Sequence, residues 1–190
     1  MTLDPTIAAS LRLAFALLFL GVALHKLRDV AGFRAALAAY DLLPPRATRA
    51  AAVVSIAAEI GIGAGLLIPA VAGRAALLGM ALLGLYGFAI AINLRRGRRE
   101  IRCGCGGLGG ERPIAPALVV RNLVLVALLG WTLLPQATRP LEWLDLVSIA
   151  FSAATAALLY LAADVAIANT EPLRRIAGVR PAQAAAGRSA

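Results

Sequence analysis

The sequence predicts an all-α membrane protein, a polytopic bundle of four to five transmembrane helices with one amphipathic helix at the membrane interface. Hydrophobic residues make up 61% of the chain and charged residues only 15%, with a mean hydropathy of +0.82. This composition leaves too little polar surface for a soluble globule. The apolar residues also gather in long runs between short basic segments, as spanning helices and their loops do.

A helix needs about 20 apolar residues to cross a hydrocarbon core of about 30 Å. The first run has no basic segment before it and no clear cleavage site after it, so we expect a spanning helix rather than a signal peptide. Gly61 and Gly65, four residues apart in the second run, predict a close helix contact. Five runs are long enough: 5–24, 50–72, the interval between Arg74 and Arg95, 116–135, and the interval between Asp145 and Asp164.

The segment 27–45 separates the first two runs and has its own periodicity. Apolar residues recur there at helical spacing, charged residues lie elsewhere around the helix, and two prolines end the pattern. We therefore expect an amphipathic helix along the interface. Its apolar positions are Val30, Phe33, Leu37 and Tyr40. We also expect one helix-bundle domain over residues 1–170 and a polar, basic, disordered tail over residues 171–190.

Lys and Arg outnumber Asp and Glu by 19 to 10, but the basic residues lie at the ends of apolar runs without interleaved aromatic residues. This pattern argues against nucleic acid and favours the lipid bilayer as the partner. If five helices cross, segments 26–49, 95–112 and 174–188 share one side, and the other side carries chiefly Arg74 and Arg139. The positive-inside rule then predicts an outward amino terminus and a cytoplasmic basic side.

Both cysteines of the chain, Cys103 and Cys105, lie one residue apart in a glycine-rich segment on that basic side. A strained disulfide would exchange readily, and Gly104 supplies the backbone freedom that so small a ring needs. The neighbouring Arg102 and Arg112 favour the reactive thiolate. Redox exchange is the preferred chemistry, with a soft ion such as Cu(I) or Zn(II) and a pair of inert thiols as alternatives. We predict no complete metal site, because only two ligands are local.

Glu59 is the only charge in the second run. A carboxylate near the middle of a span costs about 2.5–3.5 kcal/mol on insertion scales, so Glu59 should face the bundle interior and find a partner. Both a proton relay and an interhelical polar clamp fit this pattern. The candidate members of the polar set, besides Glu59, are His25, Lys26, Arg121 and Asn122.

Several of these segments resemble the MauE family, within the broader DoxX-like membrane proteins, over roughly residues 7–165. A glycine, Gly107, stands where we would expect an aromatic residue, a departure that affects the packing of the loop more than its chemistry. The matching elements are Gly21-Val-Ala-Leu-His-Lys-Leu27, Phe33 with Tyr40-Asp-Leu-Leu-Pro44, Glu59-Ile-Gly-Ile-Gly63, Cys103-Gly-Cys-Gly-Gly107 and Arg121-Asn122.

The resemblance implies a bacterial inner-membrane protein that acts with a thioredoxin-like periplasmic partner. The implied role is maturation of a disulfide-rich periplasmic protein, the small subunit of methylamine dehydrogenase. Cys103 and Cys105 would then act as a thiol–disulfide oxidoreductase, with a quinone or a cytosolic thiol completing the circuit and Glu59 balancing protons. A non-catalytic scaffold or a soft-metal-handling protein is the alternative.

Overall fold

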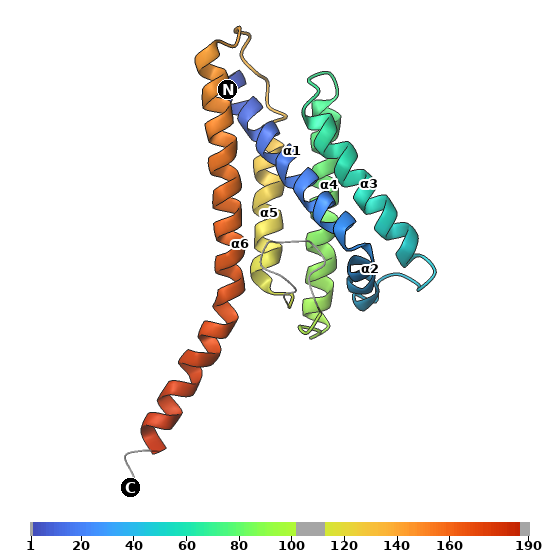
Figure 1. The fold of residues 1–190 in the computed structure, drawn as a ribbon, viewed down its shortest axis with the longest axis vertical. Coiled ribbons are helices and arrows are strands. Elements are labelled where there is room, and N and C mark those ends of the chain that lie inside the picture. Colours follow the sequence, from blue (N-terminus) through green and yellow to red (C-terminus); the bar gives the residue numbers. More distant parts are fainter. Residues whose placement is uncertain (1, 102–112, 187–190) are drawn as a thin grey trace.

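The computed structural model describes residues 2–101 and 113–186, with side chains described as far as residue 167. These residues confirm the all-α fold class: helices form throughout, the described part contains no strand, and Leu3 and Gln136 form an isolated bridge. Figure 1 shows the helices side by side in a bundle. They are α1 (Pro5–Arg28), α2 (Val30–Ala39), α3 (Thr48–Leu66), α4 (Ala72–Arg95), α5 (Pro116–Trp131) and α6 (Trp143–Ala186).

Within the described residues, four helices are long and apolar enough to cross a membrane: α1, α3, α4 and the part of α6 from Trp143 to Ile167. The fourth predicted run gives the shorter α5, whose 16 residues rise about 24 Å. This helix ends at Trp131 rather than near residue 135, and turns carry the chain onward, with the amide of Leu134 donating to the carbonyl of Trp131 at 3.1 Å. The protein is thus a multi-pass membrane protein.

The chain runs back and forth along the bundle (Figure 1). Helices α1, α4 and α6 run from the end that holds the amino terminus to the end that holds α2, and α3 and α5 run back. We call these the amino-terminal end and the α2 end. The basic segments therefore share the α2 end, whereas Arg74 and Arg139 belong to turns at the opposite end.

Helix α2 confirms the amphipathic segment between the first two spans. The Asp29 side chain caps its first turn, accepting from the amide of Gly32 at 2.8 Å. Phe33 is buried with Ala52 and Ile56 of α3, and Leu37 packs against them. The chain leaves α2 through Asp41 in the left-handed region, at φ 51°. Helix α2 thus lies against α3 and closes the α2 end of the bundle on that side.

The main core is built where aromatic residues of α1 meet apolar residues of α3, α4 and α5. Phe15 and Phe19 pack against Ile62, Ala76 and Leu129 in one buried cluster. Alanines in this cluster, such as Ala76, let the helix backbones approach closely.

The glycine contact predicted from Gly61 and Gly65 is only partly correct. Gly61 has no atom of another helix near it, and Gly63 is the residue that faces α1. Gly65 faces Ala75 of α4. The predicted close contact is confirmed at Gly65, is absent at Gly61, and is found also at Gly63, because the packing of α1 and α4 around α3 decides which glycines are covered.

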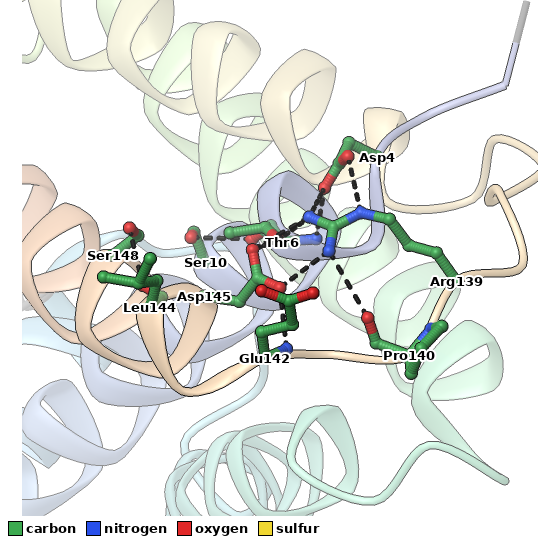
Figure 2. Close-up of polar contacts among 9 residues, drawn as sticks. All are labelled: Asp4, Thr6, Ser10, Arg139, Pro140, Glu142, Leu144, Asp145 and Ser148. Atoms are coloured by element: carbon green, nitrogen blue, oxygen red, sulfur yellow. Dashed lines mark hydrogen bonds and ion pairs between the residues drawn. The ribbon is translucent and has the colours of Figure 1, made fainter.

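At the amino-terminal end, Arg139 joins the starts of α1 and α6 (Figure 2). Its guanidinium donates to both oxygens of Asp4 at 3.1 Å and to both oxygens of Asp145 at 2.7 and 2.8 Å. These hydrogen bonds hold the pKa of Asp4 below its usual range and raise the pKa of Arg139. The Asp4 side chain also caps α1 by accepting from the amide of Thr6 at 2.8 Å.

Helix α6 packs chiefly on α1, and its spanning part is the least covered of the four long spans. Arg139 therefore fixes the start of a helix that has few apolar contacts of its own. The backbone of α6 continues to Ala186, and the division into a domain over 1–170 and a tail over 171–190 stays a prediction.

Reporter fusions test the orientation of the bundle. Fusions after residues 45, 100 and 175 should report one compartment, because all three positions follow passes that end at the α2 end. The basic bias predicts that this compartment is the cytoplasm. A fusion after residue 70, in the turn between α3 and α4, should report the opposite side. A periplasmic signal from the fusion after residue 100 would contradict the predicted orientation and indicate the opposite one.

A pair of glycine substitutions in α3 tests the packing of α1 on α3. A Cβ at Gly63 would lie 2.7 Å from Leu20 Cγ and 3.2 Å from the carbonyl oxygen of Ala16. We expect Gly63→Ala to lower the free energy of unfolding by about 1–3 kcal/mol through overpacking. Gly61→Ala, with nothing within 4 Å, is the matched control and should be neutral or stabilising. Equal unfolding transitions in one detergent would contradict the close contact.

Candidate functional site

Cys103 and Cys105 lie outside the described residues, so the structure describes only the two ends of the segment that carries them. The backbone amide of Ile114 donates to the backbone carbonyl of Ile101 at 2.9 Å. The side chains of Ile101 and Ile114 are both buried. The intervening segment therefore starts and finishes at one point, between the end of α4 and the start of α5.

The base of this loop is part of a second buried cluster. Ile101 and Ile114 pack with Ile90 of α4 and Leu118 of α5. Tyr40, at the end of α2, and Ile167 of α6 border the same cluster. Four elements thus hold the two ends of the cysteine loop at the α2 end of the bundle.

The second group of predicted residues centres on Glu59, which is buried with a relative exposure of 1%. Lys26 of α1 donates to Glu59 Oε1 at 2.5 Å, and its own exposure is only 2%. The hydroxyl of Tyr86 from α4 donates to the same oxygen at 2.7 Å and accepts from Lys26 Nζ at 3.1 Å. Three helices therefore contribute one side chain each to a buried polar cluster, which we call the Glu59 cluster.

Aromatic rings surround the ammonium group of Lys26. Its Nζ lies 4.4 Å from the centre of the Phe33 ring and 4.7 Å from the centre of the Tyr86 ring. Both distances suit cation–π attraction. Helix α2 thus supplies Phe33 as a cover over the Glu59 cluster.

Helical periodicity explains why Lys26 enters the core and His25 does not. Phe19, Ala23 and Lys26 recur at spacings of four and three residues and are all buried, which places them on one face of α1. His25 is turned about 100° away from Lys26 and is exposed. Of the partners expected for Glu59, the structure brings Lys26 into contact and leaves His25 outside the site.

Arg121 and Asn122 do not join the Glu59 cluster in the contacts that the structure describes. Arg121 donates to Asp164 of α6 at 2.7 Å and lies 5.7 Å from the ring centre of Tyr160. The amide of Asn122 is buried and donates to the carbonyl of Leu118 at 2.8 Å. Arg121 thus links α5 to α6, and Asn122 bonds within α5. The predicted polar set is therefore divided between the Glu59 cluster and helix α5. The roles of the predicted residues stay predictions.

Sequence analysis misses the contribution of Tyr86 and Phe33 to the Glu59 cluster. In the sequence, Phe33 is one of the apolar positions of segment 27–45, and Tyr86 falls within an apolar run. The usable signal is the hydroxyl of Tyr86, a hydrogen-bonding group in a run without charges.

Comparison with known proteins is consistent with this picture. Residues 4–135 match the family model described as methylamine utilisation protein MauE. The chain is 42% identical to the methylamine utilization protein MauE of Paracoccus versutus, over 85% of this chain and 88% of that protein. The corresponding protein of Paracoccus denitrificans is 38% identical over 86% and 88%, and that of Methylophilus methylotrophus 34% over 88% and 89%. No solved structure matches the chain.

Single and double substitutions test the ion pair of the Glu59 cluster. We expect Lys26→Met or Glu59→Leu alone to cost about 3–5 kcal/mol of unfolding free energy, because each leaves an uncompensated buried charge. The double variant should recover most of that loss, because apolar residues of similar volume replace the pair. The measurement is unfolding of the purified protein in detergent. Additive losses in the double variant would mean that the two charges are not coupled.

Proposed function

The chain belongs to the MauE family of methylamine utilisation proteins, and we propose that it is a membrane thiol–disulfide redox protein. In this proposal it acts with a thioredoxin-like partner in the maturation of a disulfide-containing periplasmic protein of the methylamine dehydrogenase small-subunit type. The broader DoxX-like grouping stays a prediction. The proposed location is the bacterial inner membrane, because spanning helices are typical of inner-membrane proteins, whereas outer-membrane proteins form barrels.

One observation carries the proposal. The only two cysteines of the chain lie one residue apart, in a segment whose ends are joined by the hydrogen bond between Ile101 and Ile114. The described residues at the two ends of this segment, Ile101 and Ile114, pack in one buried cluster. The basic residues Arg102 and Arg112, close to the two thiols in the sequence, favour the thiolate, which is the reactive form.

The exchange conserves electrons and sulfur atoms. The thiolate of one cysteine attacks a sulfur of the partner's disulfide, and the displaced sulfur leaves as a thiolate. The second cysteine then attacks the mixed disulfide and releases the reduced partner. The pair Cys103–Cys105 is oxidised by two electrons as the partner is reduced, and the same steps in reverse reduce the pair. A quinone is the proposed class of acceptor or donor that resets the pair in the membrane.

Cysteine substitutions test the proposal directly. We expect Cys103→Ser and Cys105→Ser each to abolish maturation of the client disulfide protein without lowering the amount of protein in the membrane, because exchange needs both thiols. One single variant should accumulate a mixed disulfide with a thioredoxin-like protein, because the resolving thiol is missing. The measurements are client activity, membrane immunoblotting, and mass spectrometry of adducts trapped by acid quenching.

The same variants separate the alternatives. Full client maturation in the double serine variant would refute the redox proposal and leave a scaffold. Loss of maturation together with stoichiometric copper or zinc on the wild-type protein, and no trapped partner, would favour a soft-metal-handling protein instead.

A further inference from the structure

The two oxygens of the Glu59 carboxylate are unequally bonded. Oε1 accepts from both Lys26 Nζ and the Tyr86 hydroxyl, at 2.5 and 2.7 Å. Oε2 is buried and has no hydrogen-bond partner among the described residues. A bare carboxylate oxygen in an apolar interior is costly, because it has lost water and gained no donor.

We propose that Glu59 is a proton-binding site within the membrane, and that Oε2 is the atom that takes the proton. When a proton binds Oε2, Oε1 becomes the carbonyl oxygen of a carboxylic acid, and it still accepts from Lys26 and Tyr86. Neither partner needs to move. The net charge of the Glu59 cluster changes from zero to one positive charge, and the Phe33 and Tyr86 rings around Lys26 Nζ help to hold that charge.

The groups that face Glu59 are few. Helix α1 contributes Lys26 and helix α4 contributes Tyr86, both in direct contact. Helix α2 contributes Phe33 over Lys26, while its own charged residue, Arg34, is exposed. His25 of α1 is also exposed. In the described contacts, no second carboxylate or imidazole shares the proton of Glu59.

Lys26 lies near the end of α1, two residues before Arg28, a rise of about 3 Å. Phe33 of α2 is buried against α3, and its ring centre lies 4.4 Å from the ammonium nitrogen of Lys26. We therefore assign to Phe33 the control of proton access from water at the α2 end.

The proton-binding site is inferred from the contacts between α1, α3 and α4. The role of the bound proton rests on the proposed function. When the two thiols pass their electrons to a quinone, two protons leave the thiols and two protons bind the reduced quinone, and a proton-binding carboxylate in the same bundle can hold one of them in transit. The test must therefore read proton binding without client maturation.

Labelling with the hydrophobic reagent dicyclohexylcarbodiimide provides such a test, since carbodiimides react with protonated carboxyl groups. We expect one adduct on the peptide that contains Glu59, with a labelling rate that rises about tenfold per unit fall in pH while the carboxyl is mostly ionised. Glu59→Gln should lack this adduct. Phe33→Ala should label several-fold faster, with Phe33→Leu as a milder variant, and thermal unfolding verifies that each variant is folded. A water-soluble carbodiimide should modify the exposed Glu142 and leave Glu59 untouched.

The absence of a Glu59 adduct at every pH, in the wild type and in both Phe33 variants, would overturn the proposal and leave a permanently ionised clamp. Labelling of Glu59 that does not change with pH would also overturn it. Equal labelling in the Cys103→Ser/Cys105→Ser double variant would support a site that the helices alone create. The maturation assay with the cysteine variants tests the thiol proposal separately, so either proposal can fail without the other.

Discussion

The requirement that a carboxylate inside a membrane bundle must meet a cation determines much of this structure. Glu59 and Lys26 lie on different helices, and their ion pair stabilises both side chains in the interior. Their contact fixes α1 against α3, and Tyr86 extends it to α4. Phe33 then covers the ammonium group, which places α2 across the bundle. The register of four helices thus depends on one buried ion pair.

Polar contacts also hold the helix that apolar packing holds least. Helix α6 exposes most of its spanning surface, as a helix at the edge of a bundle in lipid can, since lipid tails solvate leucine as well as a protein does. Arg139 holds its start through Asp145, and Arg121 holds it further along through Asp164. Both pairs use arginine, whose planar group makes several hydrogen bonds at once.

Much of this fold could be predicted from the sequence, because length and hydropathy alone define a spanning helix. The apolar runs gave α1, α3, α4 and the spanning part of α6, and the periodicity of segment 27–45 gave α2. The early end of α5 could not be predicted, because its last turn and the turns after it are equally apolar.

The site was predictable only where charge was the signal. Glu59 and Lys26 stand out as charges in or beside apolar runs. Tyr86 does not, because its ring is read as apolar and its hydroxyl gains meaning only from the partners it meets. In the same way, Gly63 rather than Gly61 faces α1 because of tertiary packing, and single-helix patterns do not contain that information.

The Glu59 cluster and the buried cluster that holds Ile101 and Ile114 share helix α4. Tyr86 and Ile90 are one turn apart on α4, a rise of about 6 Å, and Ile90 belongs to the buried cluster of Ile101 and Ile114. Close-packed interiors are stiff and transmit displacements, so a movement of Ile101 or Ile114 would reach Tyr86 through α4. This shared helix gives the proposed sulfur chemistry and the proposed proton binding a mechanical connection.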